Sequence, residues 1–594
     1  MDLFNINGPE FLKDKSSNEL TELSNKIRGF LIESISKTGG HLASNLGIIE
    51  LTVALHKVFD SPKDQIIFDV GHQCYTHKIL TGRAKEFPTL RQFKGLSGFP
   101  KRSESPHDVF ETGHSSTSIS AAVGFVEANR QNNIKQDVIA VIGDGSMTGG
   151  LAFEAINHFG QNNQKMIIII NDNEMSISKN VGALSKLFRE IRINKQYLFT
   201  KSKVPHFVKK LLSNFANTVK YFVDGPNIFE SLGYNYYGPV DGHNIKELIR
   251  HLELAKNTDK SVIIHVKTDK GKGYEPAQNN KVRWHGVGNY SVKTGEFPND
   301  GVLTWSKLIS TAVSKIEDVT VITPAMISGS SLELFEDRNL IDVGIAEGHA
   351  ATMAAGLAIN NKKVFLPFYS TFAQRAYDNI LHDIVRQNLH VVIGIDRAGI
   401  VPFDGDTHQG IFDISMFNAM VNIKIAMPKD SVEAYMLMDY AFNINTGPMV
   451  IRYPKSKVID KKAVDKIDRP SWKKELTGNN VNIISYGPDV NRLIKIVEKN
   501  NISANIYNAR FIKPIDHDMV DEILDNGLPT LIYENVVESG SLGQTVISYM
   551  STKSKQINVK LMNIKSIPEH GDVASLLIEH KLDDNSVLEV LRKL

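Results

Sequence analysis

The sequence predicts an α/β protein with three consecutive domains and mainly parallel sheets. The chain has 594 residues, which is enough for three or four domains of ordinary size. Short runs rich in β-branched residues alternate along it with segments of helical periodicity, as β-α-β units require. The two clearest of these runs end in clusters of glycine and polar residues, and ligands bind at that edge of an open parallel sheet. We place the domains at residues 1–300, 301–470 and 471–594.

The first domain contains the clearest β-α-β unit. We expect buried strands at Val138–Ile142 and Met166–Ile170, with a helical pattern between them. Further helices are expected at 19–38, 47–59 and 245–255, and further strands at 65–70 and 261–267. Segment 186–220 carries nine Lys or Arg and one acid, so we expect a solvated face, with an active-site cover as the functional alternative. Residues 275–300 have little periodicity and are expected to be a linker.

The second and third domains repeat the alternation of strands and helices. In the second we expect strands at 319–323, 342–346, 364–367, 391–395 and 448–452, and helices at 347–359 and 371–387. In the third we expect strands at 481–486, 504–508 and 530–533. The third domain shows no comparable cluster of polar groups at strand ends, so we expect it to support packing or dimer formation.

Composition excludes several classes of function. A net charge of +2 and a pI near 8.2 give no electrostatic case for binding nucleic acid or an anionic membrane. The single cysteine, Cys74, excludes an internal disulfide and a cysteine-based metal cluster, and it fits a reducing cytosol. The first residues lack the pattern of a signal peptide, and no apolar run approaches the ~18 residues that a membrane span needs. We therefore expect a soluble, cytoplasmic protein.

Two polar tripeptides follow the two strands of the first domain. Gly143-Asp144-Gly145 ends the first strand and Asn171-Asp172-Asn173 ends the second. Either one alone is explained by ordinary turn chemistry. Asp144 and Asn173 nevertheless offer oxygen ligands that suit Mg²⁺ or Ca²⁺, and the glycines let backbone amides approach a phosphate. Together the tripeptides resemble the diphosphate-binding motif of thiamine diphosphate enzymes. That resemblance implies a Mg²⁺ ion held by Asp144, Asn173 and the carbonyl of Met175.

Glu347 opens a helix in the second domain. A carboxylate at a helix N-terminus has an ordinary explanation in the helix dipole. Beside the diphosphate motif, its position resembles that of the glutamate that hydrogen-bonds the aminopyrimidine ring of thiamine diphosphate. The resemblance implies that Glu347 is catalytic, because this hydrogen bond activates the cofactor as a nucleophile and electron sink.

The order of further motifs narrows the family. The first domain contains GGHLASNLG, DVGHQCYTHKILTGR, GHSSTSIS, YGPVDGH and KGKGYEPA; the second contains IAEGHAATMAAGLA, YSTFAQRAYDNILHD, DRAGIV and DGDTHQGIFD; the third contains NARFIKPID. Over nearly its whole length the chain resembles the 1-deoxy-D-xylulose-5-phosphate synthases. The resemblance implies a transketolase-like homodimer in which domains one and two of one chain enclose the site. It also implies condensation of pyruvate with glyceraldehyde 3-phosphate and loss of CO₂, for isoprenoid, thiamine and pyridoxal synthesis.

Matching motif positions assign roles to further residues. The residues expected to line the cofactor site are His72, Gly113, His114, Ser115, Gly145, Ser146, Asn173, Tyr274 and Glu347. The residues expected around the reacting carbon are His41, His72 and His408, since imidazole can orient a carboxylate and move protons near neutral pH. The residues expected to meet the acceptor are Tyr369, Arg375, Arg397, Asp404 and Lys455. The histidines His41, His72 and His114 lie too far apart in sequence for a zinc-site pattern.

The chain departs from the family pattern at three places. Gly348 stands where the family usually has glutamine, Pro402-Phe403 where it has a small pair, and Lys455 where it has arginine. Lysine keeps the charge but loses the bidentate fork of arginine. Two of these departures fall on the acceptor side. A transketolase-like ketol transferase or a synthase with another aldehyde acceptor therefore stays open as an alternative, as does a non-catalytic cofactor-binding protein.

Overall fold

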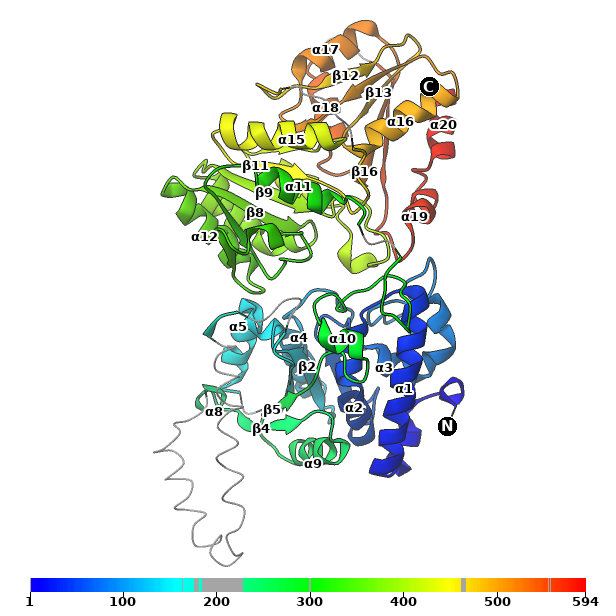
Figure 1. The fold of residues 1–594 in the computed structure, drawn as a ribbon, viewed down its shortest axis with the longest axis vertical. Helices are drawn as coiled ribbons and strands as arrows, with labels where there is room; N and C mark the ends of the chain where they lie inside the picture. Colours follow the sequence, from blue (N-terminus) through cyan, green and yellow to red (C-terminus); the bar gives the residue numbers. More distant parts are fainter. Residues whose placement is uncertain are drawn as a thin grey trace, which may run out of the picture. The chain divides into compact units, whose positions relative to one another are not determined.

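The computed structural model describes residues 2–162, 164–175, 181–183, 228–298, 301–460, 466–553, 555 and 557–594. The chain forms two compact units (Figure 1): Met1–Leu90 with Leu96–Pro298, and Arg91–Gly95 with Asn299–Leu594. The basic segment 186–220 lies outside the described residues. Within the described part of the chain, no helix is long and apolar enough to cross a membrane.

The first unit is built on a five-stranded parallel sheet. Its strands follow the order β1-β2-β3-β5-β4, and every pairing between neighbours is parallel. The bounds are β1 Gln65–Phe68, β2 Val138–Gly143, β3 Ile167–Asp172, β4 Asn235–Asp241 and β5 Val262–Lys267. Every residue of β3 is buried, as a strand covered on both faces requires. The strands expected at 65–70, 138–142, 166–170 and 261–267 are confirmed to within two residues.

Helices cover both faces of this sheet. The longer ones are α1 Ser17–Thr38, α2 Leu42–Val58, α4 Ser118–Gln131, α5 Gly150–Phe159 and α9 Ile245–Lys256. Short helical segments are η1 Leu3–Asn5, η2 Pro9–Asp14, α3 Tyr75–Lys78, η3 Ile79–Arg83, η4 Ala84–Thr89, η5 Ser146–Thr148, α8 Ile228–Ser231 and α10 Glu275–Asn279. Helix α1 begins with a capping box, because Ser16 and Glu19 bond each other's backbone amides. Helix α2 begins five residues earlier than the pattern from Gly47 suggested.

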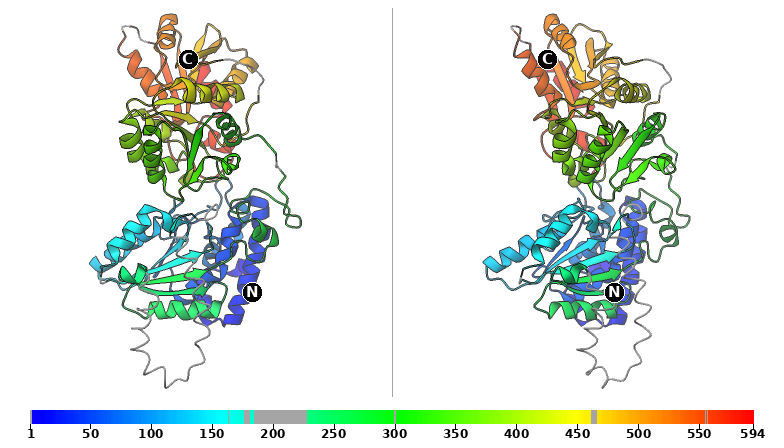
Figure 2. Two further views of the ribbon diagram at one scale, coloured as in Figure 1. Left: turned by 60° about the vertical axis from the view of Figure 1, so that its left-hand side comes forward. Right: turned by 90° about the vertical axis from the view of Figure 1, so that its left-hand side faces the viewer.

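Side chains of each strand alternate between two apolar layers. In β2, Ile139 and Val141 pack in the layer that includes α2 and α9, while Ala140 and Ile142 pack in the layer that includes α4, α5 and α8. Figure 2 shows these two sets of helices on opposite faces of the sheet. Helices cover both faces of the sheet with apolar side chains. The polar side chains therefore lie at the ends of the strands, outside the two apolar layers.

Residues 280–298 do not form the linker that we expected. Trp284, Val287 and Tyr290 are buried in the core formed with α1 and α2. The backbone of Val287 also pairs with Gly40 through two hydrogen bonds of 2.9 Å. The apolar residues here are too widely spaced to show a helix or strand period, but long-range packing orders the segment.

The second unit contains a seven-stranded sheet followed by a five-stranded one. The first has the order β15-β10-β11-β9-β8-β6-β7 and is parallel except for β15. Its bounds are β6 Val319–Thr323, β7 Leu340–Asp342, β8 Lys363–Tyr369, β9 Val391–Asp396, β10 Lys424–Ala426, β11 Met449–Arg452 and β15 Phe511–Lys513. The second has the order β12-β14-β13-β16-β17 and is parallel except for β12. Its bounds are β12 Lys473–Leu476, β13 Val481–Ser485, β14 Ala504–Asn508, β16 Thr530–Val537 and β17 Val559–Ile564.

The helices of the second unit lie between these strands in sequence. They are α11 Trp305–Val313, η7 Glu333–Phe335, α12 Glu347–Ile359, η8 Phe372–Ala376, α13 Tyr377–Asn379, η9 Ile380–Val385, η10 Asp406–His408, α14 Asp413–Asn418, α15 Ser431–Asp439, η11 Tyr440–Ile444, α16 Pro488–Lys499, α17 His517–Asn526, α18 Leu542–Met550, α19 Val573–Glu579 and α20 Asp584–Lys593. The helix expected at 371–387 is a series of 3₁₀, α and π turns. With the sheets of both units, these elements confirm an α/β fold with three mainly parallel sheets.

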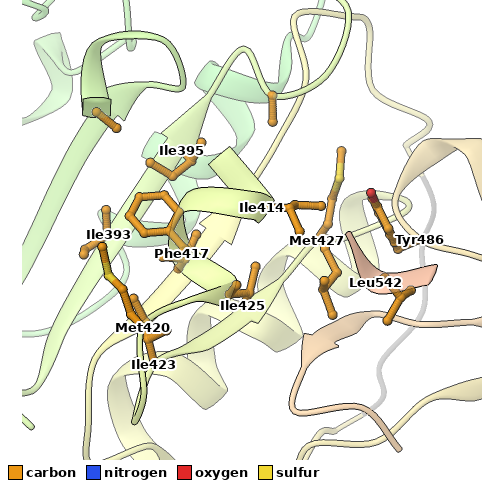
Figure 3. Close-up of a cluster of buried hydrophobic side chains, with 14 of the residues drawn as sticks. Ile393, Ile395, Ile414, Phe417, Met420, Ile423, Ile425, Met427, Tyr486 and Leu542 are labelled. Atoms are coloured by element: carbon orange, nitrogen blue, oxygen red, sulfur yellow. The ribbon is translucent and has the colours of Figure 1, made fainter. Parts of the chain in front are cut away.

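The two sheets of the second unit share one apolar core. Figure 3 shows Ile393 and Ile395 of β9 and Phe417 of α14 in the same cluster as Tyr486 and Leu542 of the later strands and helices. Strand β15, which comes from the later part of the chain, also pairs with β10 of the seven-stranded sheet. The shared core and this strand pairing hold the loops of the two sheets in fixed positions relative to each other. One of these loops carries Asp404.

Candidate active site

Asp144 and Asn173 follow neighbouring strands of the first sheet. Gly143 of β2 pairs with Asn171 of β3, and the amide of Asp144 donates to the carbonyl of Asn171 at 3.2 Å. Asp144 is buried and Asn173 is half-buried. The parallel register thus brings the two tripeptides together at the carboxyl edge of the sheet, as the sequence suggested.

Within Asn171-Asp172-Asn173 the first two side chains have structural partners. Thr268 donates to Asn171 Oδ1 at 2.7 Å, and Asp172 Oδ2 lies 2.7 Å from His265 Nε2. Asn173 Oδ1 accepts the amide of Met175 at 3.1 Å, so its side chain forms a tight turn that presents the Met175 backbone. The expected metal ligands Asn173 and Met175 therefore belong to one local turn.

The Gly113–Ser116 stretch is tied to the same edge through Asp69. The buried carboxylate of Asp69 accepts the amides of Ser116 at 2.8 Å and Ser118 at 3.1 Å. Ser116 Oγ donates to the carbonyl of Ser146 at 2.7 Å. These bonds fix the residues expected around the cofactor, of which Gly113, Gly145 and Ser146 are buried and His114 and Ser115 half-buried.

This edge suits a Mg²⁺-diphosphate group. It offers one carboxylate, one amide oxygen and the backbone of Met175, which are the hard oxygen donors that Mg²⁺ prefers. A Cβ added at Gly143 would meet no atom within 4 Å, so there is open space beside the backbone there. Among the described residues, no group of three or more His, Cys, Asp or Glu could hold a metal, and the expected set needs only one of these residue types.

Three imidazole rings gather beside this edge. The ring centroids of His41 and His72 are 5.3 Å apart, and the ring of His285 lies 5.5 Å from the first and 5.2 Å from the second. Asn45 Nδ2 donates to the carbonyls of His41 at 2.6 Å and His72 at 2.8 Å, which joins the two backbones. His285 comes from the segment expected to be a linker, so we did not assign it to the site. Like His41 and His72, His285 stands next to a glycine, Gly286, and this is the feature of the sequence that could have marked it as a site residue.

Two of these imidazoles, His72 and His285, are held neutral. Burial, together with the nearby positive charge of Lys270, lowers the pKa of His72 to about 3. The same causes, with smaller effects of His72 and His41, place the pKa of His285 well below its usual value. The Nδ1 atom of His72 is buried and has no hydrogen-bond partner among the described residues. A neutral ring with one unsatisfied nitrogen can accept or deliver a hydrogen bond to a bound molecule.

Lys270 and Tyr274 belong to one loop after β5. Lys270 is 1% exposed, and burial lowers its pKa to about 7 although the charge of Asp144 opposes this. Tyr274 was expected to contact the cofactor. Its hydroxyl donates to the carbonyl of Val292 at 3.0 Å, and its ring packs against Trp284. These contacts hold Tyr274 in place, and its contact with the cofactor stays a prediction, while Lys270 supplies charge near Asp144 and the imidazoles.

Glu347 is the first residue of α12 in the second unit. The strand before it ends at Asp342, earlier than expected, because Asp342 Oδ1 accepts the amide of Gly344 at 2.9 Å and forms a turn. Glu347 is 7% exposed, and burial raises the pKa of its carboxyl even though Arg375, at 4.0 Å, opposes this. A buried carboxyl of raised pKa holds a proton more readily than an exposed one and can share it with a bound base.

Gly348 leaves room for a neighbouring side chain. A Cβ added there would lie 2.7 Å from Asn379 Oδ1. The Nδ2 atom of Asn379 donates to Thr352 at 3.1 Å, further along α12. The side-chain amide of Asn379, from α13, therefore occupies the space where a side chain at position 348, such as the usual glutamine, would begin.

Asp404 collects three cations. Arg397 donates to its Oδ2 at 2.9 Å, Lys455 to the same oxygen at 2.5 Å, and Arg91 to its Oδ1 at 2.6 Å. These charges place the pKa of Asp404 well below its usual value although burial opposes this. Arg91, which we did not assign to the site, lies 313 residues from Asp404 in sequence. Three cations around one carboxylate leave an excess of positive charge that suits a phosphate.

Two aromatic rings border this group. Tyr369 lies under the guanidinium of Arg397, and its ring is stacked on Phe372 at 5.4 Å between centroids. His408 lies edge-on to Phe372 at 5.7 Å. The structure thus brings together Tyr369, Arg397, Asp404 and Lys455, and it adds His408 through Phe372.

The later part of the chain holds the loop that carries Asp404. The amide of Phe403 donates to the carbonyl of Gly571 at 2.9 Å. Gly405 has a φ of +80° and packs so closely on the buried ring of His570 that an added Cβ would lie 2.3 Å from it. The packing role expected for the third domain therefore extends to the acceptor loop itself.

The chain is similar to known proteins, which identify first its enzyme class and then its family. Family models match at residues 303–460 (transketolase, pyrimidine binding domain) and 471–587 (transketolase, C-terminal domain), so the chain is an enzyme of the transketolase class. A third model, 1-deoxy-D-xylulose-5-phosphate synthase, matches residues 3–268. Proteins of that name from Geobacillus sp. and Macrococcus caseolyticus are 45% and 46% identical over 99% and 100% of this chain and 98% and 99% of their own. The chain belongs to the 1-deoxy-D-xylulose-5-phosphate synthase family.

Proposed function

We propose that the protein condenses pyruvate with D-glyceraldehyde 3-phosphate, with loss of CO₂, to give 1-deoxy-D-xylulose 5-phosphate. Membership of the family over the full length of its relatives supports the reaction type. The observation that carries the acceptor assignment is the group of Arg91, Arg397 and Lys455 on Asp404, because its excess positive charge matches a phosphorylated aldehyde.

We assign the cofactor to the edge of the first sheet. Asp144, Asn173 and the Met175 carbonyl would hold Mg²⁺, and the loops with Gly113–Ser115 and Gly145–Ser146 would receive the diphosphate. When bound, thiamine diphosphate supplies a carbon nucleophile and an electron sink for decarboxylation. Glu347 would hold a proton at a cofactor ring nitrogen, for which its raised pKa suits it.

The histidines act on the substrates. His41, His72 and His285 are partly buried, and the last two are neutral, so they can orient a carboxylate by hydrogen bonds and limit the access of water. His408 is assigned to proton transfer at the acceptor, beside the phosphate contacts of Tyr369, Arg397 and Lys455. Arg375 acts through Glu347, because its charge opposes the rise of the Glu347 pKa.

We propose a cytoplasmic homodimer. The single cysteine is buried and fits a reducing compartment. Helix α5 exposes Leu151 at 41% and Phe153 at 38%, which a dimer contact would cover. Analytical ultracentrifugation of the intact protein tests the assembly state, and Leu151→Glu is expected to shift it towards the monomer.

Product analysis tests the proposed reaction. The protein is incubated with Mg²⁺, thiamine diphosphate, pyruvate and a series of aldehydes, and products are identified by NMR. We expect 1-deoxy-D-xylulose 5-phosphate from glyceraldehyde 3-phosphate. Turnover of ketose donors without pyruvate would support a ketol transferase instead, and binding without turnover would support a non-catalytic protein.

A further inference from the structure

One loop of the first unit is held from both ends by polar side chains. This loop, Asp269–Tyr274, connects β5 to α10 and carries Lys270. His243 Nε2 accepts the amide of Asp269 at 2.9 Å, and Arg28 Nε donates to the carbonyl of Lys272 at 3.0 Å. Both contacts go to the loop backbone, so they fix its path whatever its side chains are.

Glu50 of α2 links these two side chains. Arg28 Nη2 donates to Glu50 Oε1 at 2.5 Å, and His243 Nδ1 lies 3.1 Å from Glu50 Oε2. Because Nε2 of His243 accepts an amide, its ring proton must be on Nδ1, where it is donated to Glu50. Burial raises the pKa of Glu50, but His243 and Arg28 lower it by more than burial raises it. The pKa of Glu50 is therefore below its usual value, and this carboxyl is ionised. Arg28, Glu50 and His243 are called the clamp below.

The loop also lies directly against the helices that carry the clamp. The amide of Gly271 donates to the carbonyl of Ala43 at 2.8 Å. A Cβ at Gly47 of α2 would lie 3.0 Å from the carbonyl oxygen of Asp269. At Gly273, where φ is +80°, it would lie 2.4 Å from Arg28 Cδ. Such close approaches leave little freedom for the loop while the clamp is intact.

The consequence for the site comes through Lys270. This lysine is 1% exposed, and it follows Thr268, which donates to Asn171 Oδ1 at 2.7 Å and to the carbonyl of Asp172 at 2.9 Å, so the loop starts at the edge that carries Asn173. Its charge also acts on Asp144, His72 and His285. A shift of the loop would move a buried charge relative to the expected metal ligand and to two histidines. His243 belongs to the YGPVDGH motif, for which the sequence predicts no specific role.

We propose that Arg28, Glu50 and His243 position Lys270 for the binding of Mg²⁺ and thiamine diphosphate, which makes them positioning residues for the cofactor site. This proposal rests on the proposed function. The clamp touches the loop backbone rather than the cofactor, so it acts on affinity through the place of Lys270. Partners that orient a metal site in this way typically change its affinity about 10–100-fold when they are removed.

The test compares His243→Ala, His243→Gln and His251→Ala in the full-length protein. The amide oxygen and nitrogen of glutamine can replace the two ring nitrogens of His243, so His243→Gln is expected to restore most of the function. His251 of α9 contacts the carbonyl of Glu247 in its own helix at 2.8 Å and serves as the control. Calorimetric titration with thiamine diphosphate in the presence of Mg²⁺ gives the affinity, and hydrogen exchange of residues 268–275 in the cofactor-free protein gives the order of the loop.

We expect His243→Ala to weaken cofactor binding about tenfold or more and to speed exchange in the loop, while His251→Ala changes neither. Wild-type affinity in His243→Ala, or unchanged exchange in residues 268–275, would overturn the proposal. If His243→Ala does not fold, a cofactor affinity of His243→Gln far below that of the wild type, despite a restored loop, would also overturn it. Failure of the unaltered protein to bind thiamine diphosphate would instead refute the proposed function, so the two failures are distinguishable.

Discussion

The guanidinium carbon of Arg397 lies 3.9 Å from the centroid of the Tyr369 ring. The stacked ring and the hydrogen bond to Asp404 hold the guanidinium in one orientation. The side chain of Arg397 remains 23% exposed, so an anion can reach it. Arg397 is therefore positioned in advance to receive a phosphate.

Replacing Arg397 tests the acceptor assignment. We expect Arg397→Ala to raise KM for glyceraldehyde 3-phosphate about 10–100-fold, since a hydrogen bond between charged groups contributes about 1.5–3 kcal/mol. Initial rates at varied acceptor concentration measure this, and Arg386→Ala, at an exposed arginine, is the control. An unchanged acceptor KM in Arg397→Ala would show that the phosphate binds elsewhere.

The lowered pKa of Lys455 predicts that the affinity for the acceptor depends on pH. Burial lowers the pKa of Lys455 to about 8, although Asp404 opposes this. As pH rises through this value the lysine loses its charge, so we expect KM for the acceptor to increase on the alkaline side. Arginine stays charged there, and Lys455→Arg should remove the increase. Acceptor and pyruvate KM values across this pH range check it; equal alkaline profiles for the two proteins would contradict the role of Lys455.

Glu347→Gln is expected to stabilise the protein while it abolishes turnover. Burial raises the pKa of Glu347, so its contribution to stability is present below the unfolded value of about 4.3 and is lost as pH rises through the folded value. At neutral pH its charge is therefore unfavourable, and glutamine removes it. Thermal unfolding of the cofactor-free protein should give a higher Tm for Glu347→Gln at pH 8, with a smaller difference near pH 4.5. A difference that does not depend on pH, or one equal to that of the exposed Glu336→Gln, would argue against this account.

His285→Ala is expected to lower kcat about 100-fold without changing the shape of the pH profile near neutrality. The pKa of His285 lies well below its usual value and that of His72 is about 3, so neither ring changes charge in that range. Steady-state rates at several pH values and the affinity for thiamine diphosphate measure the two effects. A wild-type kcat would exclude His285 from the site, and His251→Ala on α9, whose ring contacts the carbonyl of Glu247 in its own helix, is the matched control.

Much of the fold could be predicted because its strands are continuous buried runs. Val138–Ile142 and Val319–Thr323 need no distant partner to be identified, since length and β-branching suffice. The first residue of α12 was also predictable, because a carboxylate at Glu347 marks a helix N-terminus. The parallel register then brings Asp144 next to the residues that follow β3.

The remaining site residues depend on contacts that are distant in sequence. His285 is placed by the packing of Trp284 and Val287 against α1 and α2, which no local period reveals. Arg91 reaches Asp404 across 313 residues, and β15 joins a sheet built mostly from earlier strands. The motif predicts a cofactor contact for Tyr274, but the packing of its ring on Trp284 and the hydrogen bond to Val292 are contacts that no local pattern reveals.

The proposed reaction consumes both pyruvate and a phosphorylated aldehyde in each turnover. The most direct test measures CO₂ released from pyruvate by the protein with Mg²⁺ and thiamine diphosphate, with and without glyceraldehyde 3-phosphate. We predict that the acceptor accelerates release and that each CO₂ is matched by one molecule of 1-deoxy-D-xylulose 5-phosphate. Release that is the same with and without the acceptor, or no release at all, would contradict the account.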